Sequence, residues 1–147
     1  MDNELESIHI LLVEDNPHDV EITKRALEKG QLRNRLTVAV DGQQALDILS
    51  DLQRAAELPG LILLDLNLPK LSGIEVLQEV KGDPALRGIP VIVLTTSTRE
   101  EDVVRAYDLG VNTFITKPVR FEDFINVVTT IREYWIVIAT LPAKVRA

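Results

Sequence analysis

The stretch "LILLDLNLPKLSG", residues 61–73, places an aspartate directly after four aliphatic residues and follows it with turn-forming residues. An uninterrupted aliphatic run of this length is typical of a strand that is buried on both faces of a parallel sheet. Asp65 then stands where that strand ends, and Pro69 and Gly73 are expected to shape the loop behind it. The stretch therefore predicts a carboxylate held at the edge of a buried sheet.

Four other short apolar runs recur along the chain, separated by longer segments of helical period. They are "IHILLV" (8–13), "LTVAV" (36–40), "VIVLT" (91–95) and "TFIT" (113–116). Helices are expected between these runs and after the last one. The first begins at Pro17, is capped by Asn16 and ends at about Gly30. Two more are expected over 42–56 and 73–82, a fourth has a Thr98/Glu101 capping box and ends at Gly110, and a last covers 120–139. Alternating strands and helices joined by right-handed crossovers predict an α/β fold, a doubly wound five-stranded parallel sheet.

Composition narrows the possible functions. The chain has 147 residues, of which 46% are hydrophobic, and this is enough for one domain spanning 1–147. Its net charge of -7 argues against direct binding of nucleic acid or of an anionic membrane. It has no cysteine, so disulfides, thiol catalysis and cysteine-ligated metals are excluded. The start "MDNELESIH" lacks the features of a signal peptide, and the longest apolar run is too short to span a bilayer. We expect a cytoplasmic protein.

Polar side chains follow four of the five predicted strands. Glu14 and Asp15 end the first strand, Asp65 the third, Thr95 the fourth and Lys117 the fifth. In an open parallel sheet these carboxyl ends share one edge, which is where ligands bind. Three carboxylates held close together repel one another unless a hard cation offsets their charge, and Mg²⁺ prefers such oxygen ligands. The pattern predicts a magnesium site at this edge.

The motifs "LLVEDN", "LILLDLNLP", "VLTTS" and "FITKP" resemble the receiver domain of two-component response regulators. The resemblance implies a flavodoxin-like strand order, 2-1-3-4-5, and makes Asp65 the phosphoacceptor. It also implies that Mg²⁺ is bound by Asp65, by Asp15 directly, by Glu14 through water and by the backbone carbonyl of Asn67. Lys117 would pair with the acceptor or with its phosphoryl group.

The same resemblance, which covers about residues 8–135 and leaves 136–147 as an extension, implies a conformational switch. The Thr95 hydroxyl would bond the phosphoryl oxygen, and Phe114 would rotate inward and alter the face formed by the last two helices and the strand between them. The family commonly has tyrosine where this chain has Phe114, and plain core packing is the alternative interpretation of this aromatic. The resemblance also implies a cis peptide between Lys117 and Pro118, although trans is the ordinary preference.

By this resemblance the protein is a stand-alone regulator, a switch rather than an enzyme, that receives its phosphoryl group from a sensor histidine kinase. "VLTTS" and the tail with "TLPA" resemble the small regulators of cyanobacterial and bacterial phytochrome kinases, so a bacteriophytochrome is a candidate partner. The alternative is a Mg²⁺-dependent phosphohydrolase with an aspartyl-phosphate intermediate, as in haloacid-dehalogenase-like enzymes. Those enzymes usually carry a second carboxylate two residues after the nucleophile, where this chain has Asn67, and a cap for which this chain leaves no room.

The C-terminal segment "FEDFINVVTTIREYWIVIATLP", residues 121–142, is more apolar than one buried helix face requires. One stripe at three- and four-residue spacing accounts for Phe124, Val128, Ile131 and Trp135. Other apolar residues lie outside that stripe, namely Tyr134, Ile136, Val137 and Ile138. A continuous apolar run covers the whole circumference of a helix, and soluble proteins generally reserve such a surface for an interface. We expect a homodimer, with Tyr134, Trp135, Ile136 and Ile138 in its interface; a tail folded back over its own domain is the alternative.

Overall fold

The computed structural model describes residues 8–29, 35–96, 99–131 and 133. Five strands form one parallel sheet in the order β2-β1-β3-β4-β5: β1 Ile10–Val13, β2 Leu36–Ala39, β3 Leu61–Leu64, β4 Val91–Thr95 and β5 Thr113–Thr116. The described helices are α2 Pro17–Lys29, α3 Gly42–Arg54, α4 Gly73–Gly82, α5 Glu100–Asp108 and α6 Phe121–Ile131. The doubly wound α/β fold and its strand order are therefore confirmed.

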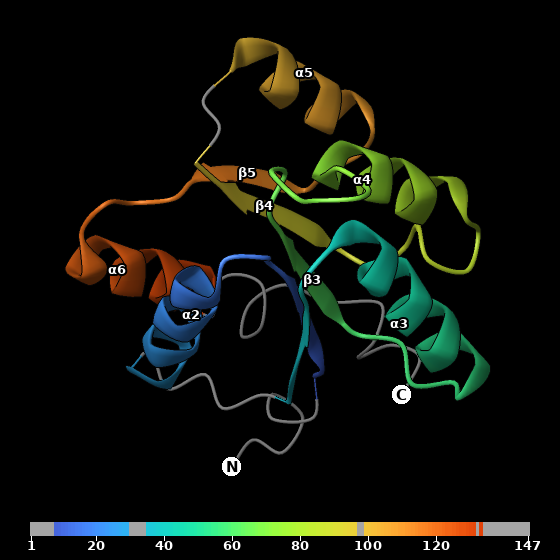
Figure 1. The fold of residues 1–147 in the computed structure, drawn as a ribbon, viewed down its shortest axis with the longest axis horizontal. Coiled ribbons are helices and arrows are strands. Elements are labelled where there is room, and N and C mark those ends of the chain that lie inside the picture. Colours follow the sequence, from blue (N-terminus) through green and yellow to red (C-terminus); the bar gives the residue numbers. More distant parts are fainter. Residues whose placement is uncertain (1–7, 30–34, 97–98, 132, 134–147) are drawn as a thin grey trace.

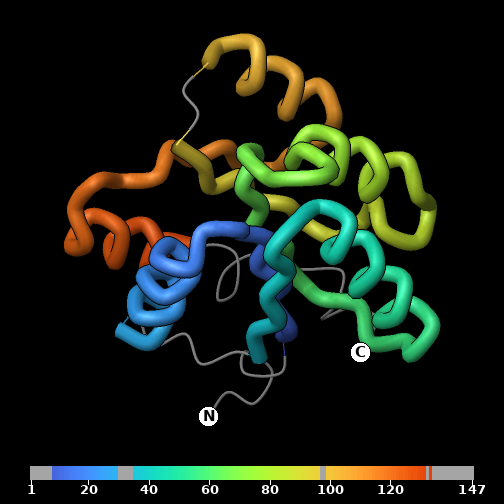
Figure 2. Tube along the Cα trace, in the orientation of Figure 1, coloured from blue at the N-terminus to red at the C-terminus, as the bar shows by residue number. Residues whose placement is uncertain are grey.

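Helices cover both faces of the sheet (Figures 1 and 2). On one face α2 and α6 pack side by side, and on the other α3 and α4 lie together with α5 next to α4. Successive strand residues point to opposite faces, so Leu63 packs beneath α2 and α6 whereas Leu64 packs beneath α3 and α4. Both faces need apolar side chains, and this explains why the strands lack polar alternation.

The register of the sheet brings the ends of the strands to one edge. Val13 of β1 stands opposite Leu64 of β3, and the Asp65 N–H donates to the Val13 carbonyl at 3.0 Å. On the far side of β4, the Lys117 N–H donates to the Thr95 carbonyl at 2.7 Å. Backbone hydrogen bonds therefore fix the positions of Asp65 and Lys117, the residues that follow β3 and β5.

The predicted start of α2 is confirmed. The Asn16 side-chain oxygen accepts the N–H of His18 at 2.9 Å and that of Asp19 at 3.3 Å, and Pro17 is the first helical residue. These bonds satisfy donors that have no partner within the helix.

The predicted capping box of α5 joins Thr98 to Glu101, and Thr98 lies outside the described residues. The described N-cap is Arg99, which makes no side-chain cap hydrogen bond, and the helix begins at Glu100. The Arg99 guanidinium binds the Glu101 carboxylate, with Nε 2.9 Å away, so a local ion pair engages the side chain that a capping box would need. Gly110, predicted as the end of this helix, lies two residues beyond Asp108 with a positive φ of 98°, a conformation that suits glycine after a helix.

The predicted apolar stripe of the last helix is confirmed as far as the description reaches. Phe124, Val128 and Ile131 are buried in the core beneath α2 and α6. Trp135 and the other proposed dimer residues, Tyr134, Ile136 and Ile138, lie outside the described residues. Across the part of the chain that is described, no helix is both long enough and apolar enough to cross a membrane.

Candidate functional site

Three carboxylates converge at the carboxyl edge of the sheet. Glu14 and Asp15 follow β1 and Asp65 follows β3, and each offers an oxygen that lies within 4.8 Å of the others. Glu14 and Asp65 are buried whereas Asp15 is exposed, so the cluster opens to solvent on one side only. A small ligand can therefore approach the two buried acids, Glu14 and Asp65, from the side where Asp15 is exposed.

Both oxygens of Asp65 accept hydrogen bonds. The Thr95 hydroxyl donates to Oδ1 at 2.7 Å, and the Asn67 N–H donates to the same oxygen at 3.1 Å. The Lys117 ammonium donates to Oδ2 at 3.2 Å and also binds Glu14. Asp65 is held in one orientation by three residues from three segments of the chain.

Burial and charge shift two pKa values in this site. Desolvation and the neighbouring charge of Asp65 raise the pKa of Glu14 to about 7, against the opposing effect of its hydrogen bond with Lys117. Burial alone would lower the pKa of Lys117, but Glu14, Asp65 and Asp19 more than offset it and raise that pKa above its usual value. Lys117 therefore keeps its proton at neutral pH, whereas Glu14 exchanges its proton near neutral pH.

The loop after Asp65 is shaped by glycine and a cap. A Cβ built on Gly73 would lie 2.4 Å from the Asp65 carbonyl oxygen and 2.4 Å from Leu66 Cα, closer than any side chain can approach. Ser72 and Glu75 form a capping box at the start of α4, which the sequence interpretation missed although the Ser-x-x-Glu spacing was visible. Together they let the helix begin directly against the backbone that carries Asp65.

The donor set fits a hard divalent cation. The three carboxylates carry a formal charge of about -3 when ionised, and among the described residues Lys117 is the cation that pairs with the two buried ones. Oxygen ligands of this kind, partly open to water, are what Mg²⁺ selects. The Asn67 carbonyl, which follows Asp65 by two residues, stands at the same turn.

The structure brings together six of the predicted residues, namely Glu14, Asp15, Asp65, Asn67, Thr95 and Lys117. Phe114 lies on β5 apart from them, half-buried against the core beneath α3 and α4, and its N–H donates to the Tyr107 hydroxyl at 3.1 Å. The expected cis peptide before Pro118 is wrong, because every described peptide bond is trans, the ordinary state even before proline.

One residue of the site was missed. An Asp19 oxygen lies 3.0 Å from Lys117 Nζ, although 98 residues separate the two in the chain. No motif spacing indicates this pair, because it depends on where the fold places the first turn of α2 relative to the residue that follows β5. The only available signal was an acidic residue in the first turn after the Asn16 cap.

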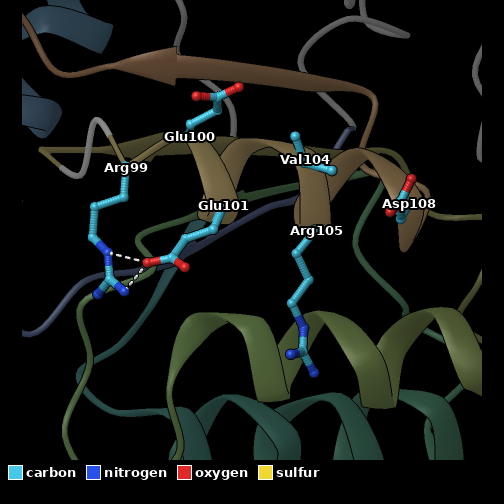
Figure 3. A pocket seen from close by; sticks show the side chains of 6 residues that line it. All are labelled: Arg99, Glu100, Glu101, Val104, Arg105 and Asp108. Carbon is cyan, nitrogen blue, oxygen red and sulfur yellow. Dashed lines mark hydrogen bonds and ion pairs between the residues drawn. The ribbon is translucent and has the colours of Figure 1, made fainter.

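A shallow surface hollow lies elsewhere, along α5 (Figure 3). Its lining carries charges of both signs around one apolar side chain: Arg99, Glu100, Glu101, Val104, Arg105 and Asp108. None of the converging carboxylates lines the hollow, so it is separate from the site.

Comparison with known proteins gives a consistent result. A family model described as the response regulator receiver domain matches residues 10–129. Response regulator Rcp1 of Synechocystis is 42% identical over 139 residues, covering 91% of this chain and 92% of its own length. The probable methanogenesis regulatory protein FilR2 of Methanothrix harundinacea is 45% identical over 128 residues, covering 86% of this chain and 83% of its own.

Two solved structures share the fold closely. The phosphorylated cyanobacterial phytochrome response regulator RcpA aligns with a TM-score of 0.86 at 43% identity, covering 92% of this chain and 99% of that one. The Mn²⁺-bound form of Rcp1 aligns with a TM-score of 0.84 at 41% identity and the same coverage of both chains. Because the family model spans most of the sequence and the relatives match nearly end to end, the chain belongs to the response regulator receiver domain family.

Proposed function

We propose that this chain is a stand-alone, cytoplasmic response regulator of one domain, residues 1–147, that accepts a phosphoryl group onto Asp65 from a sensor histidine kinase. The supporting observation is the environment of Asp65, a buried carboxylate bound by Thr95 and Lys117 and flanked by Glu14 and Asp15. The family typically uses such an acid as a phosphoacceptor.

In the proposed reaction an Asp65 oxygen attacks the phosphorus of a phosphohistidine, and an O–P bond forms as the P–N bond breaks. The electron pair of that bond returns to the imidazole nitrogen of the kinase. Lys117 and the Thr95 hydroxyl supply the donors that meet charge on the transferred oxygens.

Asp15, Asp65 and the Asn67 carbonyl would hold Mg²⁺ directly, and Glu14 through water. A bound Mg²⁺ offsets negative charge on the attacking carboxylate and on the phosphoryl oxygens. The Mn²⁺-bound form of Rcp1 supports a divalent cation in a relative of this chain.

The phosphohydrolase alternative predicts sustained turnover, whereas a switch stops after one phosphoryl group. Asn67 stands where that class usually has a second carboxylate, and this favours the switch. A switch should take up one phosphoryl group per chain in a burst and then release phosphate no faster than its aspartyl phosphate is lost. A phosphohydrolase should release phosphate steadily and faster than that.

The output would pass through the face formed by α5, β5 and α6. Thr95, bound to Asp65, and Phe114 of β5 are the proposed switch residues, linking the site to this face. Large apolar side chains stand exposed on or beside it, namely Val104, Tyr107 and Val119. Exposed apolar side chains that neighbour a switch suit a protein partner.

We further propose a phytochrome histidine kinase, such as a bacteriophytochrome, as the upstream partner. The similarity to RcpA, a phytochrome response regulator by name, supports this choice. Phosphotransfer from a panel of purified histidine kinases tests it: the phytochrome kinase should transfer fastest. Equal transfer from unrelated kinases would contradict this pairing while leaving the phosphoacceptor assignment intact.

Acetyl phosphate with Mg²⁺ should add one phosphoryl group per chain, because the site supplies the charge compensation that the reaction needs. Intact-mass measurement detects the added group. Asp65→Asn should accept none under the same conditions. An Asp65→Asn protein that is phosphorylated as readily as the parent would refute the assignment.

A further inference from the structure

Lys117 is held by three carboxylates rather than two. Its ammonium binds Glu14, Asp65 and, at 3.0 Å, Asp19 of α2. An ammonium has three N–H donors, so each can be assigned to one carboxylate. The Lys117 side chain is 5% exposed and that of Asp19 is 29% exposed, so Asp19 closes the solvent side of a buried cation.

The simplest alternative is that Asp19 merely caps its helix. It occupies the third position after the Asn16 cap, where an acidic side chain commonly accepts the N–H of the cap residue. Here Glu14 accepts that Asn16 N–H, at 3.3 Å. The Asp19 side chain instead turns to Lys117, while its own N–H is bound by the Asn16 side chain.

The three carboxylates that hold Lys117 differ in what else they do. Glu14 and Asp65 belong to the converging group that fits a cation, whereas Asp19 does not. The Asp65 bond must also change when a phosphoryl group is attached to that residue. Asp19 is therefore the one carboxylate in this set whose link to Lys117 does not compete with the ion or with the reaction.

We propose that Asp19 is a positioning residue, which holds the Lys117 ammonium so that one N–H stays directed at Asp65 and at the phosphoryl group it receives. This inference rests on the proposed function, because it assigns Asp19 a part in phosphorylation of Asp65. Asp19 acts through Lys117 and touches neither the attacking oxygen nor the phosphorus.

The first test compares Asp19→Ala and Asp19→Asn with Glu21→Gln. Glu21 is a matched control, since it is an exposed acid of the same helix that pairs with Arg25 and not with Lys117. At saturating Mg²⁺, Asp19→Ala should be phosphorylated by acetyl phosphate about tenfold more slowly, the effect of losing one hydrogen bond to a charged group. Asp19→Asn keeps an acceptor oxygen and should recover to within about threefold of the parent, and Glu21→Gln should match the parent.

Magnesium affinity, measured by calorimetry, should stay within about twofold in Asp19→Ala, because Asp19 lies outside the converging group. A merely structural role would lower the unfolding temperature without slowing phosphorylation at saturating Mg²⁺. Unchanged or faster phosphorylation of Asp19→Ala, or an equal loss of Mg²⁺ affinity, would overturn the proposal.

A second measurement needs no phosphoryl transfer. Acetic anhydride labels lysines according to their exposure and charge, and peptide mass spectrometry reports Lys117 separately. Lys117 should be labelled several-fold faster in Asp19→Ala than in the parent or in Glu21→Gln. If the parent accepts no phosphoryl group, the proposed function fails, but the labelling still shows whether Asp19 holds Lys117. Equal labelling in all three proteins would reject the inference.

Discussion

At the scale of single residues, Glu14 should make Mg²⁺ binding depend on pH. Its pKa is raised to about 7 by desolvation and by Asp65, so the metal-free protein carries a proton there below about pH 7. A cation bound beside Glu14 favours the ionised acid even when water lies between them, so binding should release that proton. Affinity should therefore fall as the pH is lowered through 7, by up to about tenfold per pH unit. Calorimetric titrations at pH 6 and pH 8 measure this difference.

Two variants separate Glu14 from its neighbours. Glu14→Gln should bind Mg²⁺ more weakly at pH 8 and lose most of the difference between the two pH values. Asp15→Asn should weaken binding at both pH values but keep the difference, because Glu14 remains. A pH dependence that survives in Glu14→Gln would show that another group takes up the proton.

The residues of the site differ in how far the sequence predicts their place. Glu14, Asp65 and Thr95 directly follow or end apolar runs, so a parallel sheet alone brings them to one edge. Asp19 follows no strand, and its contact with Lys117 depends on where the tertiary fold places the first turn of α2 relative to the residue after β5. A contact between side chains of two elements, distant in sequence and without a shared motif, cannot be predicted from a single sequence.

At the scale of elements, the start of α4 should control the geometry of Asp65. Gly73→Ala would place a Cβ against the backbone of Asp65 and Leu66, which cannot give way as a flexible side chain can. Overpacking of this kind typically costs about 1–3 kcal/mol. We expect lower stability in urea unfolding and, at saturating Mg²⁺, slower phosphorylation, because the displaced backbone carries the acceptor.

Gly82→Ala is the matched control for this change. Gly82 ends the same helix, and a Cβ built on it meets nothing within 4 Å. That variant should be neutral or more stable by up to about 1 kcal/mol, since alanine favours helices. Equal effects of the two substitutions would mean that contact with the Asp65 backbone is not what requires Gly73.

The elements themselves were predictable where several local signals agreed. The bounds of β3, β4 and β5 coincide with their predicted runs. For β3 the reason is burial of all four residues, which leaves no polar residue inside the strand. At the start of α5 the Glu101 side chain binds Arg99, an ion pair that the hydrophobic pattern does not indicate. Pairing between neighbouring polar side chains therefore cannot be predicted from that pattern.

At the scale of the whole molecule, the sheet topology separates the two ends of the proposed signal. Asp65 follows the central strand β3, while β5 at the sheet edge borders the face where a partner would bind. Thr95 of β4 touches Asp65, and Thr116 of β5 stands opposite Thr95 in the register. Only β4 therefore lies between the strand that precedes Asp65 and the edge strand β5. A conformational change at Asp65 would have to pass through few packed residues to reach that edge.

The oligomeric state should depend on the apolar C-terminal run. The run from Tyr134 to Ala139 is apolar throughout, and a two-fold interface would bury each of its side chains twice. We predict a homodimer at tens of micromolar by light scattering, with Ile136→Glu and Ile138→Glu each shifting it to monomer, because a buried unpaired charge is costly.

Val40→Glu is the control for the dimer, since Val40 is an exposed apolar residue at the other edge of the sheet, beside β2. It adds the same charge in place of the same kind of side chain and should leave the dimer intact. A monomeric parent would contradict the prediction, as would Ile136→Glu and Ile138→Glu proteins that remain fully dimeric. Dissociation by Val40→Glu as well would indicate that added charge, rather than the C-terminal run, controls association.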